Sequence, residues 1–292
     1  MEKVIAWWSG GITSAVACKL SIDLYGKENV NIIFIDTHNE DNDTYRFMLD
    51  CEKWYGLKIA TITSTKHKDI QSVWVRYLAL NNATGAVCSS ELKRQVREKW
   101  EKDNVWKHQV FGFDLNESKR AKSMAMNHGH TKPVFPLLMY GLSKKDCIKI
   151  VQEAGVLIPN VYNFGYLNNN CFKTGCVQGG IGYWQKIKLE YPDKFNTMAD
   201  MEHFITNKKG KPVTMLKDQS VFAKKSGMFQ VFLKKHPNYP NLKCIDDMRE
   251  CKVEPLFECN GFCGVNDLSE RKYSENDINF DDTNLYQKTL KL

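Results

Sequence analysis

The chain has 292 residues, of which 42% are hydrophobic and 26% charged, and its formal net charge is +7. This composition is ordinary for a globular protein, and the length allows one large domain or two small ones. No run of 18 apolar residues occurs and Met1-Glu2-Lys3 leads directly into a strand pattern, so we expect a cytoplasmic protein with neither a membrane span nor a secretory signal. The positive charge suits anionic substrates such as nucleotides.

The first predicted elements are a buried strand over residues 4–8 and a helix that begins near Ile12, separated by Ser9-Gly10-Gly11. Paired glycines let the backbone approach a ligand, and the first N–H groups of the helix are then free to bind an anion. Ser9 and Ser14 add hydroxyl donors. The segment predicts a phosphate or pyrophosphate site, and the alternative is an ordinary glycine turn before a helix.

Strand and helix patterns alternate through the first half of the chain. The strand patterns cover residues 4–8, 30–35, 58–62 and 109–113. The helix patterns cover residues 13–25, 43–55, 70–80, 91–100, 117–127 and 143–154. This alternation predicts an α/β fold with a doubly wound parallel sheet, whose ligand crevice lies at the carboxyl ends of the strands.

The second half begins with an irregular segment over residues 157–182, and helix patterns resume over residues 182–190 and 194–204. We expect an α/β domain over residues 1–206 and a basic, helical, cysteine-containing extension over residues 207–292. Between residues 207 and 235 there are eight lysines and one acid, interleaved with Phe222, Phe229 and Phe232. Two interpretations remain open. One is a nucleic-acid surface, and the other, which we favour, is a lysine-rich amphipathic helix whose apolar residues pack inward.

Polar residues follow two of the strands. Asp36 and Thr37 end the second strand, and Glu117 and Arg120 open a helix after the fourth. All four therefore fall at the ligand edge of the sheet, where Arg120 could clamp a phosphate. A capping or salt-bridge role is the alternative for each pattern taken alone.

The loop lacks the Gly-Lys-Ser/Thr ending of a Walker motif and the three spaced glycines of a dinucleotide fingerprint. It instead resembles the pyrophosphate loop of the PP-loop ATP pyrophosphatases, and residues 4–204 together resemble the phosphoadenylyl-sulfate reductase-like branch of that superfamily. The matching motifs are Ser9-Gly10-Gly11-x-x-Ser14, Asp36-Thr37 with Thr44-Tyr45-Arg46-Phe47, Val87-Cys88 with Lys93, Glu117-x-x-Arg120-Ala121, Pro159-x-x-Tyr162-x-x-Gly165-Tyr166, Cys171 with Cys176, Trp184, and Tyr191-Pro192-Asp193-Lys194-Phe195.

The resemblance implies an adenine nucleotide α-hydrolase-like fold that binds ATP with Mg²⁺. The implied nucleotide-binding residues are Ser9, Gly10, Gly11, Thr13, Ser14, Asp36, Thr37, Glu117 and Arg120, with the loop holding phosphate and the edge at Asp36 lying near the nucleoside. Thr13 stands where many members have Asp. The resemblance also implies chemistry on sulfur.

Ten cysteines without an export signal favour metal or redox chemistry over a disulfide framework. The resemblance implies a [4Fe–4S] cluster on Cys88, Cys171 and Cys176, because thiolates are the usual ligands of such clusters. Either Cys263 or Cys259 supplies a fourth ligand, or the cluster keeps one open iron. Four residues separate Cys171 from Cys176, where the family usually has two. Zinc and free thiols remain open alternatives.

Glu258-Cys259 and Cys263 partly match the nucleophilic Glu-Cys-Gly segment of sulfonucleotide reductases. A thiol pair there could attack sulfur, carry a persulfide or close a disulfide. The alternative is a pair of metal ligands or a turn with incidental cysteines.

Three functions follow. The first, which we favour, is an ATP-dependent sulfur transferase that adenylates an acceptor such as tRNA, DNA or a metabolite, releases pyrophosphate and inserts sulfur from a donor such as a cysteine desulfurase. Its catalytic residues would be Cys259, Cys263 and Arg120. The second is a reductase of adenylyl sulfate or its 3′-phosphorylated form, with Cys259 as nucleophile. The third is a nucleotide-binding or nucleic-acid-binding module without turnover.

Overall fold

The computed structural model describes residues 2–82, 85–169 and 171–256. Its main sheet has five parallel strands in the order β3-β2-β1-β6-β7. The strands are β1 (Val4–Trp8), β2 (Val30–Asp36), β3 (Ile59–Thr63), β6 (His108–Val110) and β7 (Pro133–Val134). The order reverses at β1, which pairs with β2 on one side and β6 on the other, so the sheet is doubly wound as the sequence predicts.

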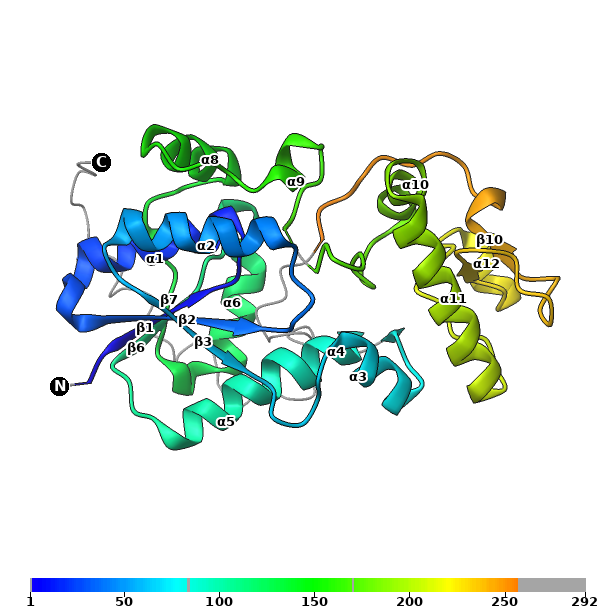
Figure 1. Cartoon of the computed structure of the whole chain (residues 1–292), viewed down its shortest axis with the longest axis horizontal. Coiled ribbons are helices and arrows are strands. Elements are labelled where there is room, and N and C mark those ends of the chain that lie inside the picture. The colour runs from blue at the N-terminus through cyan, green and yellow to red at the C-terminus, as the bar shows by residue number, and fades with distance from the viewer. Residues whose placement is uncertain (1, 83–84, 170, 257–292) are drawn as a thin grey trace.

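Helices cover both faces of the sheet (Figure 1). They are α1 (Ile12–Tyr25), α2 (Asn42–Tyr55), α3 (Ile70–Tyr77), α4 (Val87–Ser89), α5 (Gln95–Asp103), α6 (Ser118–Asn127), α7 (Pro136–Met139), α8 (Lys144–Glu153) and α9 (Asn160–Asn163). Short 3₁₀ turns lie at Lys27–Asn29, Leu115–Glu117 and Gly129–Thr131, and a π-helical stretch at Ser90–Arg94 joins α4 to α5.

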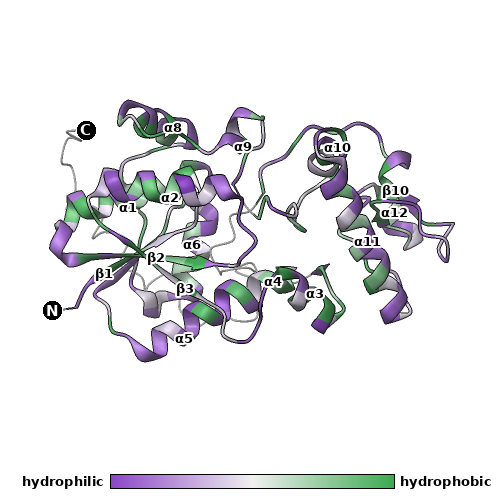
Figure 2. Cartoon of the chain, in the orientation of Figure 1, coloured by the Kyte–Doolittle hydropathy of each residue, from purple (hydrophilic) through white to green (hydrophobic). Residues whose placement is uncertain are grey.

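The alternation of side chains along β1 separates two apolar layers. Val4, Ala6 and Trp8 face the layer formed with α1, α2 and α8, whereas Ile5 and Trp7 face the layer formed with α5 and α6. Successive strand residues point to opposite faces, and every residue of β1 is buried. In Figure 2, hydrophobic colour marks β2 at the centre of the sheet, and the surrounding helices carry both hydrophilic and hydrophobic residues.

A third apolar layer joins the segment around α3 and α4 to the later part of the chain. It includes Trp74, Trp184 and Phe195, with Val231 from a small second sheet. The elements here are α10 (Ile181–Glu190), α11 (Pro192–Lys209), α12 (Val221–Ser226), β8 (Leu216–Lys217), β9 (Gln230–Phe232), β10 (Lys243–Cys244) and a 3₁₀ turn at Ile245–Asp247. Two further short strands, β4 (Asn81–Asn82) and β5 (Gly85–Ala86), pair with each other. Helix α11 continues past residue 206, where the sequence suggested a domain boundary.

The favoured interpretation of residues 207–235, an amphipathic helix with inward-facing phenylalanines, is wrong. Only the six residues of α12 are helical between β8 and β9. Phe232 is buried as expected, but Phe222 is 75% exposed and Phe229 is 38% exposed. The physical reasons are local: Ala223 is the residue of α12 that is buried, which leaves Phe222 outside, and Gly227 ends the helix in a left-handed conformation before it reaches Phe229.

None of the helices in the described ranges combines the length and apolar character needed to cross a membrane.

Candidate functional site

The loop between β1 and α1 has the conformation that its glycines predict. Gly10 has φ +86°, and a Cβ there would lie 2.8 Å from Cγ2 of Thr44. Both observations restrict the position to glycine. Inside the loop, the Ser14 hydroxyl lies 3.0 Å from the backbone nitrogen and from the hydroxyl of Ser9, and it donates to the Gly11 carbonyl. The two serines therefore fix the curvature of the loop.

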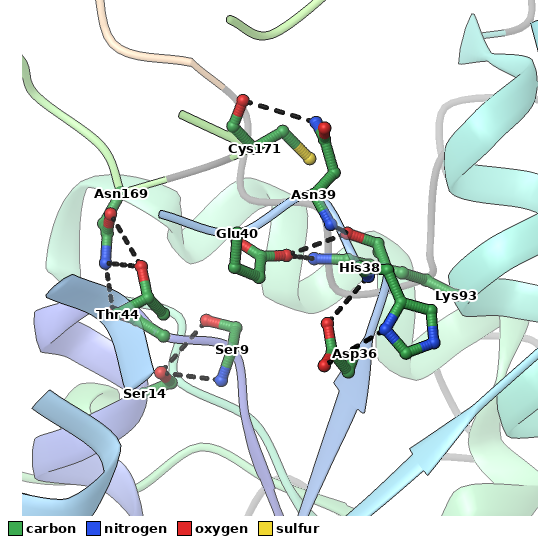
Figure 3. A network of polar contacts seen from close by, with 12 residues as sticks. Ser9, Ser14, Asp36, His38, Asn39, Glu40, Thr44, Lys93, Asn169 and Cys171 are labelled. Atoms are coloured by element: carbon green, nitrogen blue, oxygen red, sulfur yellow. Dashed lines mark hydrogen bonds and ion pairs between the residues drawn. The ribbon is translucent and has the colours of Figure 1, made fainter. Parts of the chain in front are cut away.

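The loop is also held from outside by the segment that precedes Cys171. The side-chain amide of Asn169 donates to the Gly10 carbonyl at 2.9 Å and is also bonded to the Thr44 hydroxyl at 3.0 Å. The hydroxyl of Tyr162 accepts from the backbone nitrogen of Ile12 at 3.3 Å. The contact between Asn169 and Thr44 appears on the left of Figure 3. Residues lying 150 and 159 positions downstream thus hold the phosphate loop in place.

The loop leaves backbone donors open. Within the described part of the chain, the amides of Gly10 and Gly11 make no hydrogen bond, and Gly11 begins α1 without a side-chain cap. Helix α1 has 14 residues, and its N-terminus carries the positive end of the helix dipole. Open amides at such an end form an anion site.

A pocket opens beside this loop, lined by Trp7, Trp8, Ser9, Ser14, Ile35, Lys93, Phe111 and Gly112. Its wall at Gly112 is fixed by close packing, because a Cβ at this position would lie 2.6 Å from the Cα of Ser14. Two glycines therefore shape the loop and the pocket beside it: Gly10, which follows β1, and Gly112, which follows β6. Apolar and aromatic walls with a few polar groups are typical of a ligand pocket.

Lys93 supplies the positive charge in this pocket, from the π-helical stretch after Cys88. Its Nζ lies 3.8 Å from the Glu40 carboxylate, and both side chains are buried. Burial raises the pKa of the Glu40 carboxyl above its usual value, and Lys93 and the Thr37 hydroxyl offset only part of this rise. The Thr37 hydroxyl lies 3.1 Å from the carboxylate. π-Helical turns occur frequently at functional sites, and this one places an ammonium beside the phosphate loop.

Asp36 lies at the carboxyl end of β2 and is already bonded. It accepts hydrogen bonds from the Tyr45 hydroxyl at 3.0 Å and from the backbone nitrogen of His38 at 2.7 Å. Burial and the Asp36 charge raise the pKa of Tyr45. His38 has φ +57°, and its ring contacts the hydroxyl of Thr63 at 3.0 Å. Asp36 and His38 lie to the right of Ser9 and Ser14 in Figure 3.

Glu117 and Arg120 pair with each other at the start of α6. Arg120 Nη1 donates to the Glu117 carboxylate at 2.6 Å, and its guanidinium lies over the ring of Phe113 at 5.1 Å. Neither side chain is among the described residues that line the pocket. Their assignment to nucleotide phosphate stays a prediction, as does that of Thr13, which is buried in the first turn of α1.

Cys171 and Cys176 lie close enough to interact electrostatically, and Cys88 is buried in the same apolar layer. Burial raises the pKa of the Cys171 thiol, and this residue has φ +48°. In the described ranges, however, no three His, Cys, Asp or Glu side chains are arranged to hold a metal ion. These three cysteines therefore do not by themselves form a cluster or zinc site. Cys259 and Cys263 lie outside the described residues.

Sequence reasoning quoted Lys93, Thr44 and Tyr162 as parts of motifs but did not assign them to the site, and it missed Asn169 altogether. Lys93 has a local signal, since it follows Cys88 by five residues in a helix that faces the sheet edge. Asn169 has none, because its partner at Gly10 is 159 positions away in the sequence.

A parallel sheet whose first crossover carries an open, paired-glycine phosphate loop defines a nucleotide-binding protein of the PP-loop class. Within that class, the model of the phosphoadenosine phosphosulfate reductase domain matches residues 3–172, more than half of the chain. The chain belongs to this family of enzymes.

A curated relative, an uncharacterized protein of Methanocaldococcus jannaschii, is 24% identical over 203 residues. The match covers 65% of this chain and 39% of the relative, so the chain spans about two fifths of that protein's length.

Solved structures with similarity include a phosphoadenylyl-sulfate reductase from Candida auris in a phosphate complex, with TM-score 0.43, 15% identity and coverage of 57% of this chain and 79% of that one. A U34-tRNA thiolase from Methanococcus maripaludis with its [4Fe–4S] cluster has TM-score 0.38, 14% identity and coverage of 70% and 72%. An NMN synthetase from Francisella tularensis has TM-score 0.38, 14% identity and coverage of 73% and 79%.

Proposed function

We propose that the protein is an ATP-dependent sulfur transferase that adenylates an acceptor, releases pyrophosphate and then inserts sulfur. The observation that carries the proposal is the loop itself: Gly10 and Gly11 present open amides at the N-terminus of α1, and Lys93 lines the adjoining pocket. A site with these donors stabilises a diphosphate leaving group, which gains negative charge as it departs.

In the first step, an oxygen of the acceptor attacks the α-phosphorus of ATP. The bond from this phosphorus to the oxygen bridging the α- and β-phosphates breaks, and pyrophosphate leaves with the electron pair. The amides of Gly10 and Gly11 and the ammonium of Lys93 bind the leaving group. Mg²⁺ bound with ATP supplies further charge neutralisation. The aromatic walls at Trp7 and Phe111 exclude water from the adenylated product.

In the second step, the terminal sulfur of a persulfide attacks the acceptor carbon that bears the adenylate. The carbon–oxygen bond breaks and AMP leaves. The persulfide is loaded by a donor such as a cysteine desulfurase on one of the two candidate carriers, Cys259 or Cys263. The thiolate of the other cysteine then attacks the inner sulfur, the sulfur–sulfur bond breaks and the outer sulfur stays on the acceptor carbon. The disulfide that forms between the two cysteines is reduced by an external thiol before the next turnover. We assign no step to an iron–sulfur cluster or to zinc, since Cys88, Cys171 and Cys176 do not form such a site on their own.

The test is exchange of radiolabelled pyrophosphate into ATP, measured with RNA, DNA or no acceptor present. We expect acceptor-dependent exchange in the wild-type protein and at least about a hundredfold loss in Gly10→Ala, because the loop then cannot keep its φ of +86°. Gly210→Ala is the matched control: Gly210 has φ +68° with no atom near the added Cβ and lies at the end of α11, away from the loop. Equal exchange in the two variants would refute the proposal.

The alternative is reduction of adenylyl sulfate or of its 3′-phosphorylated form, which Glu258-Cys259 favours. There the Cys259 thiolate attacks sulfur, the adenosine phosphate leaves, and a second thiol releases sulfite and closes a disulfide. Sulfite production that requires Cys259, without any exchange of pyrophosphate into ATP, would decide for the reductase. If neither reaction occurs although ATP binds, the protein is a nucleotide-binding module.

A further inference from the structure

The excursion between β8 and β9 places apolar and basic side chains together on the surface. We call residues 217–230 the Lys–Phe tip. Figure 1 shows α12, its centre, at the end of the molecule away from the five-stranded sheet. Its exposed apolar residues, with the exposed fraction of each, are Val221 (69%), Phe222 (75%), Met228 (48%) and Phe229 (38%).

The lysines of this tip are available for a ligand. Lys217, Lys224 and Lys225 make no ion pair among the described residues. The one acid in the tip, Asp218, is turned away from solvent: it pairs with Lys243 at 2.8 Å and accepts from the backbone nitrogen of Ser220 at 2.9 Å. The surface of the tip is therefore positive without internal compensation.

The tip is braced by its own hydrogen bonds. Asp218 donates its backbone N–H to the Phe229 carbonyl at 2.7 Å, so the two ends of the excursion lie side by side. The Ser220 hydroxyl accepts from the backbone nitrogen of Ala223 at 3.3 Å, and Ala223 faces the core with 2% exposure. This inward Ala223 fixes the orientation of α12, which leaves Phe222 outside. The exposed rings are thus held in place by a supported turn.

We propose that the Lys–Phe tip binds a single-stranded segment of nucleic acid. Lysine ammonium groups neutralise backbone phosphates, and exposed aromatic rings stack on unpaired bases. An acidic peptide would use the lysines but not the rings. A membrane surface would need a longer amphipathic helix than the six residues of α12. If the proposed function holds, this binding identifies nucleic acid as the acceptor, and in that respect alone the inference rests on the proposed function. Binding itself needs no ATP.

The test is fluorescence anisotropy of the full chain, without nucleotide, using labelled oligo(U) and oligo(dT) of about twelve residues. We expect Phe222→Ala with Phe229→Ala to weaken binding at least about tenfold, since each stacked base is worth about that much. Replacing Lys217, Lys224 and Lys225 by Gln should reduce the slope of log affinity against log salt by about 2, because each phosphate contact on a single strand contributes about 0.7.

The matched control removes one lysine and one exposed apolar residue elsewhere, Lys102→Gln with Val105→Ser, near the end of α5. It should bind as the wild type does. Unchanged affinity in both tip variants would overturn the proposal. The proposal would also be overturned if the wild-type protein bound phosphatidylserine vesicles but neither oligonucleotide, and the tip variants lost this binding to vesicles. Pyrophosphate exchange is measured separately in each variant, so failure of the tip and failure of the proposed chemistry give different results.

Discussion

The side-chain amide of Asn169 donates a hydrogen bond of 2.9 Å to the carbonyl of Gly10. This bond ties the segment that carries Cys171 directly to the phosphate loop. Asn39 continues the connection, since its side-chain amide donates to the Thr174 hydroxyl at 2.8 Å. The cysteine segment and the nucleotide loop therefore form one structural unit.

Asn169 gives the first prediction. Asn169→Asp should weaken ATP binding more than Asn169→Ala does, because a carboxylate would face the Gly10 carbonyl and an incoming phosphate. We expect about a tenfold loss for the aspartate and a few-fold loss for the alanine, as one hydrogen bond is worth about 1 kcal/mol. Calorimetric titration with ATP measures both. Asn160→Ala, an exposed asparagine in the same segment, is the control, and equal affinities for the Asp and Ala variants would contradict the prediction.

Gly10 gives the second. Gly10→Ala should lower the free energy of unfolding by about 1–3 kcal/mol, because its φ of +86° and the approach to Thr44 both disfavour a Cβ. Urea unfolding followed by tryptophan fluorescence measures it. Gly210→Ala has a positive φ but no close contact, so it should cost less. If the two variants lower the free energy of unfolding by the same amount, the close approach to Thr44 contributes nothing to the cost at Gly10.

Lys93 gives the third prediction. Lys93→Met should reduce pyrophosphate affinity about tenfold to a hundredfold, through loss of a charged hydrogen bond, and should destabilise the fold by leaving Glu40 buried without its partner. Adding Glu40→Gln removes the stranded charge. The double variant should therefore regain stability while its pyrophosphate affinity stays low. Recovery of affinity in the double variant would show that Lys93 serves the fold rather than the ligand.

Glu202 gives the fourth. It is buried on α11 and accepts backbone hydrogen bonds from Met215 at 2.9 Å and Leu233 at 2.7 Å. Burial raises the pKa of this carboxyl from 4.5 to about 8. Between these values the folded state holds a proton that the unfolded state has released. The contribution of Glu202 to stability is therefore fully present below pH 4.5 and is lost as the pH rises toward 8.

The measurement is urea unfolding at several pH values across this window. In the wild type this carboxyl lowers the free energy of unfolding by up to about 1.4 kcal/mol per pH unit. Glu202→Gln should remove that slope, and it should cost about 1–3 kcal/mol at low pH because its NH₂ group faces a backbone N–H. Asp200→Asn, an exposed carboxyl on the same helix, should keep the slope. A slope that persists in Glu202→Gln would assign it to another group.

The sequence by itself determined most of the sheet and the loop. The pattern over residues 4–8 matches β1 residue for residue, the pattern over residues 30–35 stops one residue short of the end of β2, and the pattern over residues 58–62 is shifted by one residue against β3. The fourth predicted strand, residues 109–113, overlaps β6 but extends three residues past its end, and the short strand β7 was not predicted. Local signals suffice here, because buried parallel strands are continuous apolar runs and the glycines and helix caps between them act over a few residues. The paired glycines predicted the phosphate loop for the same reason.

Only the tertiary structure decided which distant residues complete the site and which surfaces stay open. Asn169 reaches Gly10 across the fold, Lys93 enters the pocket from a π-helical turn, and Gly112 packs on Ser14. The sequence left two interpretations open for the residues of the Lys–Phe tip, and only the structure shows which of its rings face outward. Contacts between residues far apart in the chain depend on packing that no local pattern encodes.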